Sequence, residues 1–469
     1  MRRAAWFLGP FTLVAGAVFA CEADTTTGGG PTFQLDGSVP PFDAGQAPFD
    51  AGQAPFDAGV PDSGPDAPSG SPSVTVTVTG RTGPKADVRV VFHDANGAVL
   101  ETKLTDASGK ATSTGTLPSM ASALLGTSGQ RQIVTWTGLE DGDDLAVREP
   151  EIFAEVMVGE YEVTIPSRID DMAARYDVHV SGCSNGLGRG TSATVALWDT
   201  CVSGDKSAVL VRAYDGDTQP VSHSFKKANP VPTDGGTVAV LTGPWMPATP
   251  VTITATNTPE GASFHAQLLA IADGYGYEHG FDPLADGSVT FFTADGFAEA
   301  LQSSIMLSSG SGRRVIAKRV APGPAISFDA AQLLPEIEGM DIGGTDARRP
   351  VISWTASSTA GTDGGIVRVF FSGQDGGNAW TFVVPPGATS VTAPAMPPEA
   401  ESFLPASDAG PNAFWRQEAT FIEADVIPSY KAFRNQQGTL FPVRDSFFAF
   451  PVLPANGTYR MTSWVPLPS

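Results

Sequence analysis

The stretch SVTVTVT, residues 73–79, alternates valine and threonine without interruption. Because successive side chains of an extended chain point to opposite faces, this pattern puts every valine on one face and every threonine on the other. β-Branched residues also favour strands. We therefore expect residues 74–79 to form a half-buried β-strand, and the domain that follows to be built from strands of this kind.

The residues after this strand continue with short apolar runs separated by turn-forming residues. Residues 85–93 and 98–104 predict two further strands, and Asp-Ala-Asn-Gly at 94–97 predicts the turn between them. A second turn is expected at 105–110. Later strands of this unit, which should end near residue 158, are expected at 133–137 and 145–147.

The run GPKADVRVVFHDANGAVLETKLTDASGKATSTGTLP, residues 83–118, resembles the carboxypeptidase-regulatory-like repeat, a transthyretin-type β-sandwich. The resemblance is carried by six residues: Gly83, Val88, Val90, Thr105, Asp106 and Gly109. Ala86 and Asp87 stand where that family usually has a small residue followed by glycine. The resemblance implies a β-sandwich over residues 73–158 and an accessory module rather than a catalyst.

Residues 159–340 again consist mainly of predicted strands. We expect them at 161–165, 176–180, 194–198, 208–214, 221–225, 237–241, 251–255, 262–271 and 289–292. Residues 184–190 are expected to form a glycine-rich loop, and 296–307 and 328–337 could each form a short helix. The pattern fits either one β-sandwich or two.

Residues 341–469 resemble a fibronectin-type-III or related immunoglobulin-like module. Strands are expected at 350–354, 365–372 and 379–384, and the proline-containing segment 385–392 resembles the one that leads into a strand in that family. A loop should follow from 398 to about 412, with further sheet through Trp464. The fold class we predict is all-β, with tandem immunoglobulin-like β-sandwich domains after a signal peptide and a disordered linker.

Residues 1–20 have the features of an export signal: Arg2 and Arg3, then a short apolar run. Cys21 directly follows Val18-Phe19-Ala20, which resembles the lipobox of bacterial lipoproteins, although Phe19 is larger than usual. The resemblance implies that Cys21 is lipidated and that the protein belongs to the bacterial cell envelope, as an outer-membrane lipoprotein. The alternative is ordinary cleavage after Ala20, which would give a secreted protein.

Residues 21–72 join this cysteine to the first strand. Residues 22–72 contain eight acidic residues and no lysine or arginine, and PFDAGQA occurs at 41–47 and 48–54, followed by PFDAGVP at 55–61. A proline and a glycine in each repeat exclude a continuous helix. We expect a disordered, solvated spacer between the anchor and the folded domains.

The composition restricts the class of partner. The formal net charge of −22 argues against nucleic acid, because binding to phosphate requires an excess of basic residues. No apolar run after the signal approaches eighteen residues, so the membrane contact we expect is the N-terminal lipid. A surface protein or a polysaccharide remains as a possible partner.

The three cysteines are Cys21, Cys183 and Cys201. With Cys21 lipidated, the other two form an even pair, and an exported protein favours a disulfide between them. The alternative is two separate buried thiols. Neither cysteine has a CxxC partner, so zinc is not expected.

No nucleophile elbow, HExxH, P-loop, dinucleotide-binding or EF-hand motif occurs in the sequence. The weak candidates for a metal or acid–base site are Glu278, His279 and Asp282, but the interpretation we favour for them is a structural hairpin loop. The acidic run 140–144 could hold calcium, although such a run more often forms a solvated turn. Trp136, Trp198 and Trp354 lie at strand positions where burial is expected.

These observations predict a non-enzymatic, cofactor-free envelope lipoprotein that presents β-sandwich modules for binding or scaffolding. One alternative is a hydrolase of surface polymers with an unrecognised site. A deep pocket in which Glu278 and His279 converge would favour it. The other is a carbohydrate-binding protein, which an exposed, aromatic-lined sheet face would favour.

Overall fold

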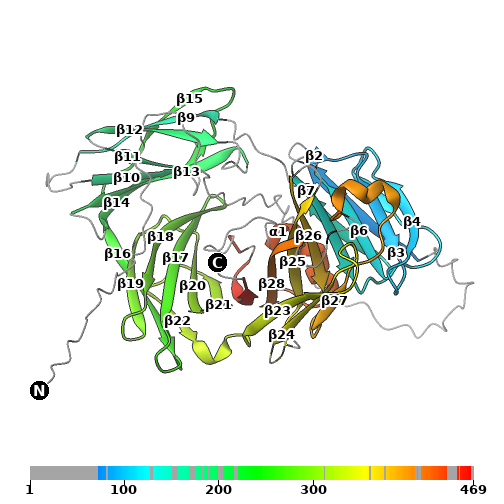
Figure 1. Cartoon of the computed structure of the whole chain (residues 1–469). Helices are drawn as coiled ribbons and strands as arrows, with labels where there is room; N and C mark the ends of the chain where they lie inside the picture. Colours follow the sequence, from blue (N-terminus) through cyan, green and yellow to red (C-terminus); the bar gives the residue numbers. More distant parts are fainter. Residues whose placement is uncertain are drawn as a thin grey trace, which may run out of the picture. The chain divides into compact units, whose positions relative to one another are not determined.

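The structure is a computed structural model. It describes residues 72–465 except for 81–82, 127–129, 150–156, 168–174, 181–183, 189, 199–201, 203, 216–219, 311, 357, 359–360, 374–375, 407–408, 410–412, 441–451 and 454. Strands dominate this part of the chain, which confirms the all-β prediction (Figure 1). Cys21, Cys183 and Cys201 lie outside the described residues, as do the signal segment and the linker, so lipidation and the disulfide remain predictions.

The N-terminal strands form two facing sheets. They are β1 (Val74–Gly80), β2 (Gly83–Pro84), β3 (Arg89–His93), β4 (Val99–Leu104), β5 (Lys110–Thr112), β6 (Met120–Leu125), β7 (Gln130–Thr137) and β8 (Asp143–Arg148). In one sheet, β1 pairs with β2, β5 and β8, whereas β4, β3, β6 and β7 are successive neighbours in the other. Val74, Val76 and Val78 are completely buried between the sheets, as the alternating pattern predicts.

Three of the residues at the family-like turns have a clear physical role. The hydroxyl of Thr105 accepts a hydrogen bond from the backbone N–H of Val88 (2.9 Å) and donates one to the carbonyl of Lys85 (2.7 Å). Gly109 has φ 74°, and an added Cβ would collide with the carbonyl of Val78. Asp87 has φ 62°, a left-handed conformation that aspartate tolerates better than most residues. The position where the family usually has glycine thus keeps a glycine-like backbone.

The middle of the chain contains two hydrophobic cores. Its strands are β9 (Met157–Thr164), β10 (Arg175–Val180), β11 (Ser184–Gly188), β12 (Ser192–Trp198), β13 (Lys206–Tyr214), β14 (Pro220–Pro230), β15 (Thr237–Leu241), β16 (Met246–Thr256), β17 (Phe264–Ala272), β18 (Tyr275–Pro283), β19 (Ser288–Ala294), β20 (Ala300–Ser309), β21 (Gly312–Val320), β22 (Ala325–Asp329) and β23 (Ile337–Gly343). The first core lies between the sheet β12-β9-β15 and strands β10 and β13. The second lies between β17, β18, β20 and β21 on one side and β16, β19 and β22 on the other.

The C-terminal part adds β24 (Val351–Ala356), β25 (Gly364–Gly373), β26 (Gly376–Val384), β27 (Ser390–Thr392), β28 (Phe414–Ala424), β29 (Gly457–Trp464) and the helix α1 (Tyr430–Leu440). Strands β23, β24 and β27 form a small sheet. It covers a core that contains Trp354 and Trp380. Trp136 and Trp354 are buried, as expected, and Trp198 is partly buried.

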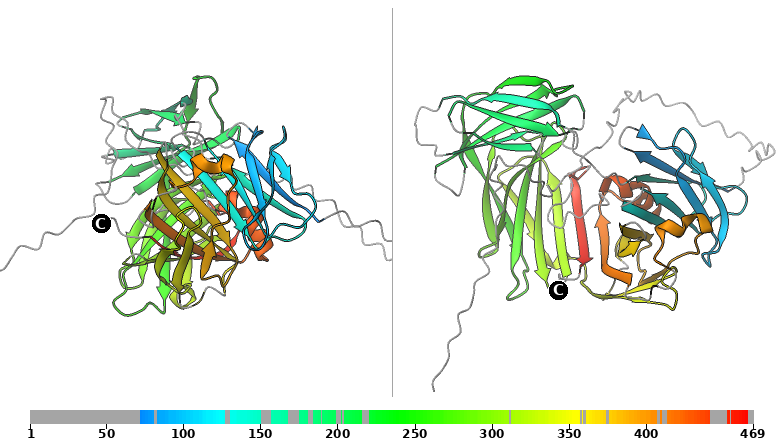
Figure 2. Two further views of the ribbon diagram at one scale, coloured as in Figure 1. Left: turned by 45° about the vertical axis from the view of Figure 1, so that its right-hand side comes forward. Right: turned by 45° about the horizontal axis from the view of Figure 1, so that its top comes forward.

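Strands from all three regions join in one twelve-stranded sheet, in the order β18-β17-β20-β21-β29-β28-β25-β26-β7-β6-β3-β4. Strand β26 pairs with β7 in parallel, although their sequences are far apart. The last strand, β29, lies between β21 and β28 and is antiparallel to both (Figure 2). The regions predicted as tandem modules are therefore connected through backbone hydrogen bonds as well as through the chain.

The two predicted helices are wrong. Residues 300–309 form β20, whose first eight residues are buried between β17 and β21. Its run of Ala, Leu, Gln and Ser favours a helix locally, but pairing on both edges stabilises the strand. In 328–337 only a single 3₁₀ turn forms, at Ala330–Gln332, capped by Asp329.

Two segments predicted as loops are strands in the structure. One helix, α1, was not predicted from the sequence. Residues 184–188 form β11, and 275–283 form β18. Helix α1 occupies a segment expected to be sheet; the hydroxyl of Ser429 accepts a hydrogen bond from the N–H of Ala432 at its start (3.2 Å). Within the described residues, no helix is long and apolar enough to cross a membrane.

Candidate functional site

The three weak candidates lie on β18 but do not converge. Glu278 and Asp282 are exposed, whereas His279 is buried. A β-bulge opposite Leu268 and Leu269 makes His279 the extra residue of the strand and turns its ring toward the core. Among the described residues, no group of three or more His, Cys, Asp and Glu side chains is arranged to hold a metal ion.

The carboxylate of Glu278 still has an unusual environment. Partial burial of the group raises the pKa of Glu278, although the residue as a whole is exposed, and the charge of Arg212 and a hydrogen bond from Gln267 oppose this shift. A raised carboxyl pKa suits a general acid. Such an acid requires a second group beside it, and His279 points away.

His279 instead belongs to a cluster that we call the histidine layer: His179 on β10, His223 on β14 and His279 on β18. The rings of His223 and His279 have centroids 5.9 Å apart. The Nδ1–H of His279 donates to the carbonyl of Phe292 (2.8 Å), which leaves its Nε2 as an acceptor. That Nε2, both ring nitrogens of His223 and the Nε2 of His179 have no hydrogen-bond partner among the described residues.

Arg212 on β13 adds a positive charge to this layer. It lies opposite Asp177 and His223 in the sheet register, and its guanidinium donates to the carbonyl of Glu278. Burial, and then the charge of Arg212, lower the pKa of His223 to about 3 and hold the pKa values of His179 and His279 well below 6.5. At neutral pH these rings are therefore uncharged proton acceptors, held between β10, β13 and β14 on one side and β18 on the other.

The other two histidines have local structural contacts. His265 stacks on Phe281, with ring centroids 5.1 Å apart and an angle of 4° between the planes. His93 is completely buried, and its Nε2 is 3.0 Å from the hydroxyl of Ser122. Neither contact points to catalysis.

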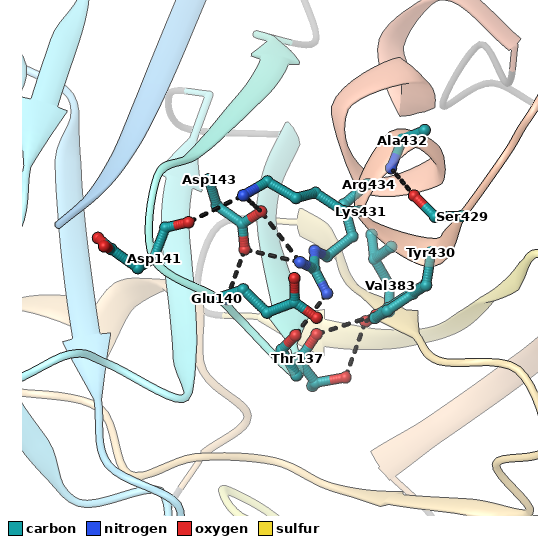
Figure 3. A network of polar contacts seen from close by, with 11 residues as sticks. Thr137, Glu140, Asp141, Asp143, Val383, Ser429, Tyr430, Lys431, Ala432 and Arg434 are labelled. Carbon is teal, nitrogen blue, oxygen red and sulfur yellow. Dashed lines mark hydrogen bonds and ion pairs between the residues drawn. The ribbon is translucent and has the colours of Figure 1, made fainter. Parts of the chain in front are cut away.

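The acidic run 140–144 contributes to an ion-pair network (Figure 3). Asp143 is completely buried, and both of its carboxylate oxygens accept hydrogen bonds from Nη2 of Arg434 in α1, at 2.7 and 3.0 Å. Lys431 donates to the carbonyl of Asp141 (2.8 Å). Residues 141 and 142 form the expected turn, with Glu140, Asp141 and Asp144 exposed, but Asp143 is buried in the ion pair rather than solvated. Among the described residues no group of carboxylates is arranged to hold a metal ion, so the calcium alternative gains no support.

The same network fixes α1 against the sheets. Arg434 also donates to the carbonyl of Gly138, and its guanidinium lies 4.5 Å from the ring centroid of Tyr430. The hydroxyl of Tyr430 is within hydrogen-bond distance of the carbonyls of Thr137 and Val383, at 2.9 and 3.0 Å. These contacts connect β7, β8, β26 and α1. They explain why α1, from the C-terminal part of the chain, packs against the core of the N-terminal strands.

One exposed aromatic site was not predicted from the sequence. Trp415 on β28 has 58% of its surface exposed, and its ring centroid is 5.3 Å from that of Phe370 on β25. The guanidinium of Arg416 lies 5.2 Å from the Phe370 ring and that of Arg368 5.8 Å. Glu418 forms ion pairs with both arginines. We call Phe370, Trp415, Arg368, Arg416 and Glu418 the Trp415 surface.

A β-bulge produces this surface. The register shifts between Phe370 and Phe371, so that Phe371 faces Phe414 and Phe370 faces Arg416. Trp415 is the extra residue of β28 at this bulge, and its side chain lies at the surface rather than in the core in which Phe371 is buried. The signal in the sequence is the run Phe414-Trp415-Arg416, which interrupts the period-two pattern of the strand.

No protein-family model and no curated protein matches this chain. Among solved structures, the Bacillus anthracis TIE protein is similar at 11% identity and a TM-score of 0.14, over 55% of this chain and 50% of that one. The pilus adhesin SpaC from Lactobacillus rhamnosus GG, in its open conformation, is similar at 9% identity and a TM-score of 0.13, over 67% of this chain and 43% of that one. The native conformation of E. coli alpha-2-macroglobulin is similar at 14% identity and a TM-score of 0.11, over 72% of this chain and 26% of that one. The chain thus spans half or less of each protein's length, and these likenesses assign neither family nor function.

Proposed function

We propose that this chain is an exported, lipid-anchored protein of the bacterial cell envelope that serves as a binding scaffold. The observation that carries the proposal is the twelve-stranded sheet, which hydrogen-bonds strands of three regions into one platform. Such a platform holds surface residues in fixed positions, as binding requires. The signal-like residues 1–20 and Cys21 support export and anchoring.

Fractionation of cells tests the anchor. Replacing the thiol in Cys21→Ser should move the protein from the membrane fraction to the soluble fraction, because acyl chains contribute about 0.8 kcal/mol per buried methylene. Mass spectrometry of the mature N-terminus should find acyl groups on Cys21. An unmodified N-terminus at Cys21, or one that begins at a later residue, would show a secreted protein instead.

Carbohydrate is the ligand class that the Trp415 surface favours. An exposed indole paired with a second ring offers an apolar face on which a sugar ring can stack, and arginine and glutamate beside it can bond to hydroxyl groups. Two arginines against one glutamate give this surface a positive charge on a chain with a formal charge of −22. Sugars that carry carboxylate groups are therefore expected to bind more tightly than neutral ones.

Binding to immobilised polysaccharides tests this assignment. The Trp415→Ala variant should lose up to about tenfold in affinity, since stacking on an aromatic ring contributes roughly 0.5–1.5 kcal/mol. The matched control is Leu241→Ala, which removes another exposed apolar side chain (68% exposed) away from the surface. Equal binding by both variants would exclude this surface as the glycan site.

The absence of catalysis remains a prediction. A hydrolase would need convergent groups, and the candidates of the sequence, Glu278, His279 and Asp282, do not supply them. A polymer-degradation assay with the full chain tests the point. Turnover that Glu278→Gln abolishes without loss of folding would establish an enzyme instead.

A further inference from the structure

Strand β4 is the last strand of the twelve-stranded sheet at its N-terminal side. Among the described residues it pairs with β3 and has no strand partner on its other edge. Three of its six residues are exposed apolar side chains: Val99 at 39%, Leu100 at 42% and Leu104 at 53%. An exposed edge with apolar side chains is a template for pairing with another strand.

The hydrogen bonds at the end of β4 show which backbone groups face outward. The N–H of Thr105 donates to the carbonyl of Val88 (2.9 Å), and its carbonyl accepts from Asp87 (3.0 Å), so its backbone points toward β3. The backbone N–H and C=O groups of successive residues in a strand point to opposite edges. The backbone groups of Lys103 therefore also point toward β3, whereas those of Thr102 and Leu104 point to the open edge. Thr102 can therefore form a hydrogen-bonded pair with an incoming strand.

The sequence Glu101-Thr102-Lys103 is complementary to itself when it runs antiparallel around Thr102, because Glu101 then lies opposite Lys103 of the other copy. Leu100 is the extra residue of a β-bulge in β4, since Glu101 pairs with Phe92 and Val99 pairs with His93, so the regular part of the new ladder is residues 101–103. We propose that β4 pairs with β4 of a second copy of this chain, so that two sheets join across a twofold axis. Opposite charges at directly facing positions stabilise antiparallel strands.

The charges select a second copy over an unrelated strand. In the monomer, Glu101 accepts from the N–H and the hydroxyl of Thr114, at 2.6 and 2.9 Å, and Lys103 lies 3.4 Å from Glu101 and donates to Thr112. Both charges stay on one face, at the edge. A lysine at an edge normally opposes pairing, and an apolar strand would leave these charges without new partners. The matching strand must place a basic residue opposite Glu101 and an acidic residue opposite Lys103. A second copy of β4, running antiparallel, does both.

A cysteine at the twofold axis tests the register. Across a hydrogen-bonded pair the Cα atoms are about 5.5 Å apart, which suits a disulfide. The full Thr102→Cys chain, in mild detergent and under mild oxidation, should form a covalent dimer well above the wild-type background. In the matched control Leu104→Cys, two residues further along the same edge, the cysteines would be roughly 13 Å apart and should not join. No excess of dimer for Thr102→Cys, or equal dimer for both variants, would overturn the proposal.

A charge swap tests complementarity independently. Lys103→Glu places like charges opposite each other twice and should weaken the dimer about tenfold in analytical ultracentrifugation. The double variant Glu101→Lys/Lys103→Glu restores opposite charges and should recover the dimer. Thermal unfolding of each variant checks that the monomer still folds. A double variant that folds but stays as weak as the single one contradicts self-pairing in this register.

Discussion

Among the described residues, two buried polar clusters contain an arginine, and they differ in whether the groups around it are paired. In the Asp143–Arg434 network both carboxylate oxygens of Asp143 accept hydrogen bonds from the guanidinium. In the histidine layer, Arg212 donates to a carbonyl, but four ring nitrogens of the histidines have no partner among the described residues. One cluster is a closed ion pair, and the other is a set of neutral acceptors beside a positive charge.

The difference teaches what each cluster contributes. A paired buried charge adds little net stability, but an arrangement that separates the pair leaves a buried charge uncompensated and is strongly destabilised. The pair therefore fixes α1 in one position. An unpaired buried nitrogen costs stability, about 1–3 kcal/mol, at any pH at which it stays neutral. It also takes up a proton only when the structure around it opens. The first cluster thus specifies the fold, whereas the second makes it sensitive to acid.

Removing one member of the ion pair should have the largest effect. Arg434→Met leaves the carboxylate of Asp143 buried without its main partner, and we expect a loss of about 3–5 kcal/mol in the free energy of unfolding, measured with urea at pH 7. The control Arg460→Met breaks the more exposed pair with Glu423 and should cost at most about 1 kcal/mol.

A second variant separates charge pairing from simple packing. Arg434→Met/Asp143→Leu removes both charges, and it should recover most of the stability lost by Arg434→Met alone. If the double variant is as unstable as the single one, the network contributes through shape, and the comparison with the histidine layer fails.

Acid should act on the histidine layer with the next largest effect. The folded pKa of His223, about 3, is below the value of about 6.5 in the unfolded chain, so stability is present above pH 6.5 and is lost as the pH falls toward 3. Between pH 7 and pH 5 this one group should cost about 2 kcal/mol. His223→Phe removes the group, and the difference in unfolding free energy between the two pH values should shrink by that amount.

The Arg460→Met variant is the matched control for this experiment, because it keeps the histidine layer and leaves no buried charge without a partner. It should be at most about 1 kcal/mol less stable than the wild type at both pH values while losing as much between them. A pH dependence that is unchanged in His223→Phe would mean that His223 binds protons equally well in both states.

The sequence predicted the parts of the fold in which local pattern and packing agree. In β1 the period of two and the burial of Val74, Val76 and Val78 coincide. For Ala300–Ser309 they conflict, because a run buried on both faces has no alternation to read. The bulges that turn His279 inward and Trp415 outward shift the pattern by one residue, and a shift of one residue reverses which face a side chain occupies.

The candidate sites were less predictable than the strands, since they depend on contacts between distant residues. Asp143 and Arg434 are 291 positions apart, and nothing near either residue identifies its partner. The acidic run therefore suggested a solvated turn, with calcium as the alternative, and neither interpretation predicts a buried ion pair. The same holds for the histidines, whose common position arises from the pairing of β10, β13 and β14 and from the bulge in β18.

The smallest effect is expected in a third buried cluster, which is neutral and mostly paired. His93, Ser122, Thr135 and Trp380 form a chain: the Nε2 of His93 is 3.0 Å from the Ser122 hydroxyl, which is 2.9 Å from that of Thr135, and the indole of Trp380 donates to Thr135 (2.9 Å). Ser122→Ala leaves two neutral groups short of one hydrogen bond and should cost about 1–2 kcal/mol in urea unfolding at pH 7. Burial also lowers the pKa of His93 to about 4, so the cost should not disappear at pH 5. If Ser122→Ala is as damaging as Arg434→Met, then charge is not what distinguishes the Asp143–Arg434 network, and the loss of any buried partner has the same effect in this protein.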